Sequence, residues 1–451
     1  MRAASSELGQ RTALDRYVAA PDASYRYRLV ETFPGNGYAA YLLELISQRW
    51  RDEAEVDRPL WKHWLTAVVP EEVTADAALL VIGGGSNSRE RPARANPLLA
   101  MAAVATRSVT AELRMVPNQP LIFAGEAQPR AEDAIIAYSW DKYLRTGDEF
   151  WPLRLPMTKS VVRAMGVVTA FAGSAAGGGV EVGRFVLGGA SKRGWTAWTT
   201  AAVDRRVAAV IPLVIDILNI EASFEHHYRS YGFWAPAIAA YQASGIMRWA
   251  GTRELAALLA IEDPFAYRGR LTMPKFIINS AGDQYFLPDS SKFYFDALEG
   301  EKYLRYVPNT DHSLKGSDAG ESAFAFYESI VQGRPRPKFS WRFEPDGAIA
   351  IDTETRPLSA VLWQATNPNA RDFRLETIGP AYRPSPLEAC GEGRYRAWIP
   401  EPARGWAAYF VELTFASGGR FPFKFTTAVR IAPETLPFGP PPELTAGFFK
   451  T

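Results

Sequence analysis

The chain is poor in cysteine and histidine, and it lacks long apolar runs. Cys390 is the only cysteine among 451 residues, which excludes an intramolecular disulfide and any zinc site built on several cysteines of one chain. No stretch of about 18 apolar residues is present to span a membrane. The segment before Tyr25 also lacks the apolar centre of a secretory signal. The sequence as written therefore predicts a soluble protein with no membrane span and no visible leader.

The chain also lacks an excess of charge of either sign. It has 50 basic and 49 acidic residues, and no dense run of Lys or Arg is present. A phosphate-backbone partner would require such a run, so we expect no nucleic acid. Hydrophobic residues make up 47% of the chain, which is typical of a globular protein. A chain of this length exceeds what one hydrophobic core usually organises, so two or three domains are expected.

Apolar runs of strand length alternate with segments of helical spacing through the first three quarters of the chain. The predicted strands are Ala77–Ile82, Val109–Val116, Arg184–Leu187, Val207–Ile215, Lys275–Asn279 and Tyr303–Val307. The predicted helices are Pro97–Thr106, Glu132–Arg145, Pro156–Phe171, Lys192–Val203, Ser290–Leu298 and Glu321–Val331. Such alternation is typical of a mostly parallel sheet covered by helices. The aromatic segment 219–270 interrupts it, and we interpret that segment as an inserted helical cap.

The pattern changes after the Pro- and Arg-rich stretch that begins at Gly333. Short β-rich runs follow, namely Phe339–Phe343, Ser359–Gln364 and Tyr409–Phe415. We predict an α/β domain over residues 1–335 and a small sandwich-like β domain over 338–436. The Pro-rich tail, 437–451, is expected to be extended.

Ser191 lies between a predicted strand and a predicted helix, in the sequence Gly189-Ala190-Ser191-Lys192-Arg193-Gly194. This is the context of a nucleophile elbow, a sharp turn that presents a serine and needs small neighbours. Arg193 stands at the usual second glycine, and Gly194 follows one residue later. On the local motif alone, a serine that only caps the helix is an equal alternative.

A catalytic serine needs a base, and the chain has four histidines: His63, His226, His227 and His312. His312 follows the last predicted strand of the sheet, where a base would be presented. Asp283 follows the preceding predicted strand and is the expected acid, while Asp216 remains an alternative. The order Ser191, Asp283, His312 is that of the α/β-hydrolase fold, which we therefore predict for residues 1–335.

An acyl-transfer site also needs donors for a developing oxyanion. We expect them to be the backbone N–H of Lys192 and one from the glycine-rich loop, with Gly84, Gly85 and Ser86 as candidates. The side chains of Lys192 and Arg193 also suggest a weak attraction for an anionic substrate group.

Neither a nucleotide cofactor nor a metal is expected. The loop at Gly83 lacks the third glycine of a dinucleotide fingerprint, and Trp195 occupies the position of a phosphate-binding lysine. The Glu225-His226-His227 stretch could suggest metal ligands, but adjacent side chains diverge on a helix and no supporting motif is present.

Several segments together resemble the PhoPQ-activated pathogenicity-related family, over about Leu14 to Gly333. The matching segments are Trp61–Leu65, Ile82–Asn87, Arg114–Leu121, Tyr138–Gly147, Leu155–Met165, Gly189–Trp195, Tyr231–Pro236, Thr272–Ser291 and Tyr303–Leu314. The resemblance implies an α/β-hydrolase fold, location in the periplasm or outside the cell, and a bacterial context of envelope stress or virulence. Some members of the family are regarded as secreted signals that restrain proliferation.

The leading hypothesis is a serine hydrolase that forms an acyl-enzyme on Ser191 and cleaves an ester or a peptide amide. The alternative is a secreted signalling or binding protein on a hydrolase fold whose effect does not depend on catalysis. The expected partner is a small-molecule or peptide substrate. Neither the substrate nor the oligomeric state is indicated by the residues.

Overall fold

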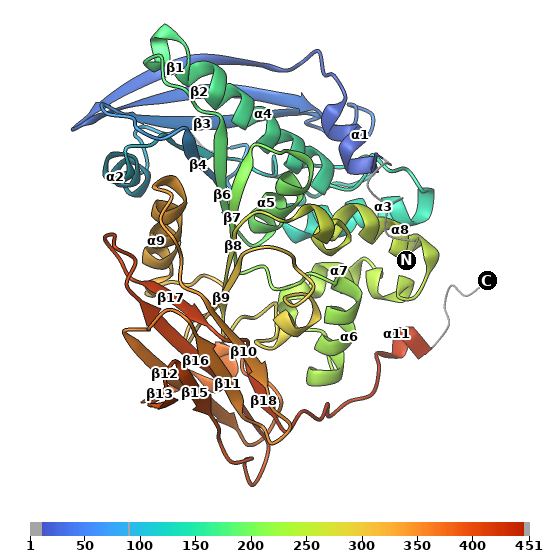
Figure 1. Cartoon of the computed structure of the whole chain (residues 1–451). Coiled ribbons are helices and arrows are strands. Elements are labelled where there is room, and N and C mark those ends of the chain that lie inside the picture. Colours follow the sequence, from blue (N-terminus) through green and yellow to red (C-terminus); the bar gives the residue numbers. More distant parts are fainter. Residues whose placement is uncertain (1–10, 89–90, 446–451) are drawn as a thin grey trace, which may run out of the picture.

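A nine-stranded sheet organises the chain from residue 26 to residue 307 (Figure 1). The computed structural model describes residues 11–88 and 91–445. In spatial order the sheet is β1-β2-β3-β5-β4-β6-β7-β8-β9. Strands β4 to β9 run parallel, and β1, β2 and β3 add an antiparallel extension beside β5. The strands are β1 (Arg26–Gly35), β2 (Tyr38–Arg49), β3 (Leu60–Pro70), β4 (Ala77–Ile82), β5 (Thr110–Leu113), β6 (Arg184–Ala190), β7 (Val207–Leu213), β8 (Lys275–Ser280) and β9 (Lys302–Val307).

Sequence analysis identified the parallel strands and missed the antiparallel extension. Strand β2 is buried along most of both faces, as is β3, so neither shows the alternation of apolar and polar residues that marks a half-exposed strand. Strand β5 is shorter than predicted because the chain turns at Met115, which has φ +66°.

Helices cover both faces of this sheet. Helices α2 (Pro97–Thr106) and α9 (Ala319–Val331) lie on one face. On the other face lie α1 (Ala13–Ala19), α3 (Asp133–Thr146), α4 (Arg154–Ala172), the 3-10 turn η1 (Ala175–Gly177) and α5 (Lys192–Val203). Successive strand residues alternate between these layers: Leu79 packs in one cluster with Leu99 of α2, and Leu80 packs in another with Met165 of α4. The predicted helices Pro97–Thr106 and Lys192–Val203 are confirmed at both ends. Within residues 11–88 and 91–445, no helix combines the length and apolar character needed to cross a membrane.

The inserted cap is helical, as predicted. It lies between β7 and β8 and consists of α6 (Ile220–Tyr231), η2 (Pro236–Ile238), α7 (Ala239–Ala243), η3 (Ile246–Trp249), α8 (Arg253–Glu262) and η4 (Pro264–Arg270). Several of its aromatic residues pack inward: the Tyr241 ring contacts those of Phe224 and of Trp140 on α3, at centroid distances of 6.3 and 5.4 Å. Aromatic side chains of this segment therefore anchor the cap to α3.

The prediction of a helix over Ser290–Leu298 is wrong. Only a 3-10 turn forms, η5 (Ser290–Phe293), and Tyr294 leaves helical geometry with φ −145°. The fully buried hydroxyl of Tyr294 donates to Asp216 at 2.6 Å. A tertiary contact therefore overrides the local helical spacing.

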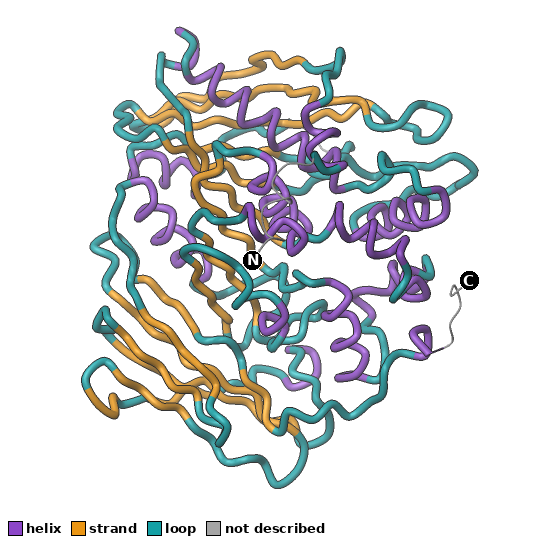
Figure 2. The backbone as a smooth tube through the Cα atoms, turned by 45° about the vertical axis from the view of Figure 1, so that its right-hand side comes forward, coloured by secondary structure: helices purple, strands orange, loops and turns teal. Residues whose placement is uncertain are grey.

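Two antiparallel sheets follow α9 (Figure 2). One has the order β10-β11-β15-β14, and the other has β13-β12-β16-β17 with β18 also paired to β16. The strands are β10 (Phe339–Phe343), β11 (Ile349–Thr353), β12 (Ser359–Asn367), β13 (Arg383–Pro386), β14 (Ala389–Gly391), β15 (Arg394–Ala397), β16 (Trp406–Phe415), β17 (Phe423–Thr426) and β18 (Arg430–Ala432), with the short helix α10 (Leu375–Ile378) after β12. Apolar residues of both sheets, such as Ile351 and Val411, share one core cluster, as in a sandwich.

The β sheets pack directly against the edge strand β9. The Tyr303 ring stacks on Phe425 of β17 at 4.1 Å, and the Tyr306 N–H donates to Thr426 Oγ1 at 3.0 Å. The change of architecture after residue 335 agrees with the sequence, but the core continues across it, so separate domains at that boundary remain a prediction.

The Pro-rich tail is not simply extended. The Phe438 N–H donates to the Arg229 carbonyl at 3.1 Å, and Trp234 Nε1 donates to Glu443 at 3.3 Å. These contacts hold the tail against α6 and the segment that follows it, and residues Pro442–Thr445 form the short helix α11. The last part of the predicted tail, 446–451, lies outside the described residues.

Candidate active site

Ser191 occupies a sharp turn between β6 and α5. Its backbone has φ +57° and ψ −131°, a conformation that a side chain seldom adopts. A Cβ added at Gly194 would lie 2.7 Å from the Gly189 carbonyl oxygen, and one added at Gly189 would lie 2.7 Å from the Arg193 carbonyl carbon. The displaced second glycine thus serves the same close approach of helix and strand as in the usual motif. The Ser191 side chain forms no capping hydrogen bond, so the simple helix-cap alternative is wrong.

His312 lies beside Asp283 on the loops after β9 and β8. Its Nδ1 is 2.8 Å from Asp283 Oδ2 and 3.0 Å from Oδ1. The His312 backbone N–H donates to Gln284 Oε1 at 2.8 Å, and the Tyr285 ring centroid is 4.4 Å from that of the imidazole. The Asp283 side chain is only 2% exposed, while that of His312 is 19% exposed. A buried carboxylate therefore orients a ring that is still accessible from one side.

Asp216, the alternative acid, faces a different set of partners. Its two oxygens accept hydrogen bonds from the hydroxyls of Tyr294 and Tyr306, each at 2.6 Å. Burial raises the pKa of Asp216 to about 7, although both tyrosines oppose that shift. The geometry therefore favours Asp283 as the partner of His312.

We expect Asp216 to make stability fall with rising pH. The carboxyl is protonated in both states below about pH 4, whereas between about pH 4 and its folded pKa of about 7 only the folded protein retains the proton. Over that window the free energy of unfolding should fall by up to ~4 kcal/mol. Asp216→Asn removes the titrating carboxyl. In urea unfolding at a series of pH values, the free energy of unfolding of the variant should therefore rise relative to that of wild type until about pH 7. Parallel pH profiles would contradict the assignment.

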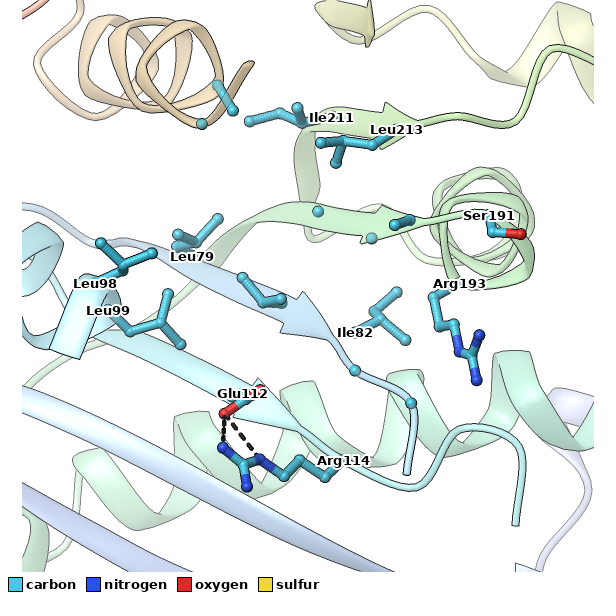
Figure 3. Close-up of a pocket in the computed structure, with 18 of the residues that line it drawn as sticks. Leu79, Ile82, Leu98, Leu99, Glu112, Arg114, Ser191, Arg193, Ile211 and Leu213 are labelled. Atoms are coloured by element: carbon cyan, nitrogen blue, oxygen red, sulfur yellow. Dashed lines mark hydrogen bonds and ion pairs between the residues drawn. The ribbon is translucent and has the colours of Figure 1, made fainter. Parts of the chain in front are cut away.

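One cavity of about 1110 Å³ brings most of the predicted site residues together. Ser191 and His312 line it, and so do Gly84, Gly85 and Ser86 of the glycine-rich loop after β4. Figure 3 shows Ser191 at the start of α5 and Ile82 at the end of β4, just before that loop. The backbone at Gly85 has φ +145°, a conformation in which a side chain would be strained. Distant sequence segments thus meet at the carboxyl ends of β4, β6 and β9.

The side chains of Lys192 and Arg193 are paired, which corrects the idea that they attract an anionic substrate. Lys192 Nζ lies 2.8 Å from Glu132 and 3.3 Å from Asp133, and Arg193 Nη2 lies 2.6 Å from Glu132. Burial alone would raise the pKa of Glu132, but the two cations lower it to about 2. Arg193 also occupies the space next to Gly84, where an added Cβ would meet its guanidinium at 2.6 Å.

Glu132 is a site residue that sequence reasoning missed. It was placed only at the start of a predicted helix, yet it has φ +54° and lines the cavity with Ser191. Its distance from Ser191 in the sequence hides this role. The one available signal was the pair of adjacent cations at the elbow, which requires a carboxylate when it is buried.

An ion pair between two fully buried side chains supports the first turn of α5, next to the elbow. Arg154 Nε is 3.3 Å from Glu262, and both side chains are fully buried. Arg154 Nη1 donates to the Lys192 carbonyl at 2.8 Å, and the guanidinium lies 4.2 Å from the Trp195 ring centroid. Arg154 therefore connects α4, the cap and the first turn of α5.

Arg154→Met should lower the free energy of unfolding by about 3 to 5 kcal/mol, because it leaves Glu262 buried without its cation. Urea denaturation of the purified variant would measure the loss. Arg184→Met is the matched control, since Arg184 pairs with Asp76 where both side chains are about half exposed. That pair should contribute less than about 1 kcal/mol. Equal losses in the two variants would refute a special role for Arg154.

The other three histidines are engaged elsewhere. His63 Nε2 lies 3.0 Å from Ser47 Oγ, and His227 Nε2 accepts from the Ala235 N–H at 3.1 Å. His226 contacts Asp289 at 3.0 Å, and Arg371 bonds to the same carboxylate at 2.6 Å. Over the described ranges, no group of three or more His, Cys, Asp or Glu side chains is arranged to hold a metal ion.

The parallel strands β4 to β9, the helices on both faces and the serine at the turn after β6 define an α/β-hydrolase-fold protein. A profile of the PhoPQ-activated pathogenicity-related protein family matches residues 14–374. The chain belongs to this family.

Two kinds of relative resemble the chain. It is 36% identical over 457 residues to Autocrine proliferation repressor protein A of Dictyostelium discoideum, with 95% of this chain and 92% of that protein covered. Acetyl xylan esterase 1 from Thermoanaerobacterium sp. JW/SL YS485 is 18% identical with a TM-score of 0.48, over 70% of this chain and 91% of that one. An acetyl xylan esterase from Paenibacillus sp. R4 is 15% identical with a TM-score of 0.49, over 72% and 96%.

Proposed function

We propose that the protein is a serine hydrolase that cleaves an ester or amide through an acyl-enzyme on Ser191. The observation that carries the proposal is the shared cavity. It is lined both by a serine held in a strained turn and by a histidine whose Nδ1 is bonded to a buried carboxylate. A serine, a base and an orienting acid at one cavity are the groups that nucleophilic acyl transfer requires.

The reaction proceeds in two steps. His312 Nε2 takes the proton of the Ser191 hydroxyl while Oγ forms a bond to the substrate carbonyl carbon. His312 then gives that proton to the leaving oxygen or nitrogen as its bond to carbon breaks. A water molecule then attacks the acyl carbon while His312 takes its proton. His312 returns that proton to Ser191 Oγ as the bond from Oγ to carbon breaks, and the acid product leaves. Asp283 accepts from Nδ1 throughout and stabilises the imidazolium that forms in each step.

The oxyanion of each tetrahedral intermediate would be held by backbone donors. The Lys192 N–H belongs to the first turn of α5, where helix N–H groups have no partner within the helix. The opposite donor would come from Gly84, Gly85 or Ser86. The side chains of Lys192 and Arg193 pair with Glu132, and Gln119 Nε2 donates to both Glu132 and the Gly85 carbonyl. These contacts link the elbow to the loop and hold the donors in place before the charge develops.

A fluorophosphonate probe tests the proposal directly. We expect wild-type protein to be labelled and the adduct to lie on the peptide that contains Ser191, as read by mass spectrometry. Ser191→Ala should not be labelled, and His312→Gln should be labelled far more slowly because the serine has lost its base. Labelling of Ser191→Ala at the wild-type rate would exclude Ser191 as the nucleophile.

A second candidate function rests on the Dictyostelium relative, whose name describes a proliferation repressor. On this alternative the protein is a secreted signalling or binding protein and its effect does not depend on catalysis. Ser191→Ala separates the two candidates, because it removes the nucleophile and leaves the surface almost unchanged. A biological effect retained in full by this variant would favour signalling, and an effect lost with hydrolysis would favour catalysis.

A further inference from the structure

The cavity at Ser191 extends far beyond the site of reaction. From the elbow and the glycine-rich loop it follows the face of the sheet between α2 and α9 (Figure 3). In that view Ser191 and Arg193 lie at one end, and Leu98 and Leu99 lie at the other. Its volume of about 1110 Å³ matches the upper end of ligand pockets, which run to about 1,000 Å³. An acetyl group would leave most of this space empty.

The cavity exposes apolar surface in the middle of the sheet, which is unusual. A parallel sheet is normally covered on both faces. Here Val81 of β4 and Leu213 of β7, both on central strands, are only partly buried. Leu98 of α2 also lines the cavity and is 69% exposed. The space between α2 and α9 therefore has an apolar floor and mostly apolar walls that no part of the described chain covers.

Both arginines of the cavity wall are already paired with carboxylates. Arg114 Nη2 lies 2.9 Å from Glu112, and Arg193 is bonded to Glu132. These pairs lie on β5 and just after it, and between the elbow and the start of α3. Aliphatic and aromatic residues of α2, α9 and the strands dominate the rest of the lining, where the exposed Glu321 of α9 is a further carboxylate. A peptide in the apolar part would leave its backbone N–H and C=O groups without partners, which is costly. An anionic chain would also find no unpaired arginine in this lining, because Arg114 and Arg193 both have carboxylate partners.

We propose that this cavity binds the unbranched hydrocarbon chain of a long-chain acyl ester, with the ester carbonyl at Ser191. This inference rests on the proposed hydrolysis at Ser191, and it names the substrate class. The acyl carbon bonds to Ser191 Oγ while the chain lies on the sheet between α2 and α9. A hydrocarbon chain needs no hydrogen-bond partner, and it gains free energy by covering the exposed apolar floor.

Kinetics on 4-nitrophenyl acetate, butyrate, octanoate and dodecanoate, below their micelle concentrations, would test this inference. Because each buried methylene improves transition-state binding, wild-type kcat/KM should rise by about tenfold or more from acetate to the best long-chain ester. Highest activity on acetate would overturn the inference. A chain-length preference confined to acetate esters of longer alcohols would place the alcohol in the cavity, and would overturn the acyl assignment.

Two variants on the cavity wall and one control locate the effect. Ala323→Trp on α9 fills the space, and Leu98→Asp puts a charge at a position that is exposed enough to tolerate it in the folded protein. Each should lower the ratio of long-chain to acetate kcat/KM by about tenfold or more. Ala105→Trp is the control, because Ala105 is exposed on α2 and does not line the cavity. An unchanged ratio in both wall variants would overturn the inference.

A binding experiment separates this inference from the proposed catalysis. Ser191→Ala should bind a fluorescent long-chain fatty acid, and Leu98→Asp introduced into the same protein should weaken that binding by about tenfold or more. If no ester is hydrolysed but the fatty acid binds and Leu98→Asp weakens it, the cavity assignment stands and the catalytic proposal fails. If esters are hydrolysed but the fatty acid does not bind, the hydrocarbon-chain assignment fails and the catalytic proposal stands.

Discussion

Ser191→Ala should reduce kcat for ester hydrolysis by about 10⁵-fold or more, because removal of the nucleophile leaves only the oxyanion donors and substrate binding to accelerate the reaction. The replaced hydroxyl makes no capping bond to α5, so its loss should leave the fold intact. Steady-state kinetics on an activated ester, with far-ultraviolet circular dichroism as a check of folding, would measure the effect.

Ser313→Ala is the matched control for this prediction. Ser313 is exposed and adjacent to His312, and its hydroxyl bonds to Asp311 at 2.6 Å. The same chemical change at this position should leave kcat within about twofold to threefold of wild type, as for most surface substitutions. Activity of Ser191→Ala within tenfold of wild type would require a different nucleophile, and the acyl-enzyme proposal would have to be withdrawn.

Asp283→Asn should reduce kcat by about 10⁴-fold, because an amide beside Nδ1 favours the wrong imidazole tautomer and cannot stabilise the imidazolium. The effect should appear in kcat rather than in KM, since Asp283 does not contact the substrate in the proposed mechanism. Asn is nearly isosteric with Asp, so packing of this buried side chain should be preserved. Steady-state kinetics over a range of substrate concentrations would separate the loss in kcat from any change in KM.

Asp216→Asn is the matched variant for this prediction, because the sequence left Asp216 and Asp283 open as the acid. Both carboxyls are buried, and both follow parallel strands of one sheet. Asp216 bonds to Tyr294 and Tyr306, however, and Asp283 bonds to His312. Asp216→Asn should therefore retain kcat within about tenfold of wild type while it changes the pH dependence of stability. A larger kinetic loss at Asp216 than at Asp283 would reverse the assignment.

These experiments also bear on the two candidate functions. The fold by itself does not distinguish a hydrolase from a binding protein built on the same scaffold. A strained serine, an oriented histidine and an open apolar cavity are costly features for a protein that only presents a surface. We therefore rank hydrolysis first, and the Ser191→Ala protein is the reagent that tests both candidates.

The central sheet was predictable because its strands carry their own signal. Continuous apolar runs such as Ala77–Ile82 identify strands buried on both faces, and the segments between them have helical spacing. Strands β2 and β3 were missed because they do not alternate, and buried polar residues such as Gln48 and His63 interrupt their apolar runs. The failed helix at Ser290–Leu298 has a different cause, since Tyr294 is directed inward by its bond to Asp216.

The sequence by itself determined which residues were candidates: a serine in an elbow, one histidine after the last strand, two possible acids and a glycine-rich loop. Local turn chemistry, which acts over a few residues, and the order of the segments along the chain sufficed for this. Only the tertiary structure decided which acid meets His312, that Glu132 pairs with Lys192 and Arg193, and that an apolar cavity continues from Ser191 between α2 and α9. Those features depend on side chains that are brought together from distant strands, and no local pattern records how far apart two helices lie on a sheet.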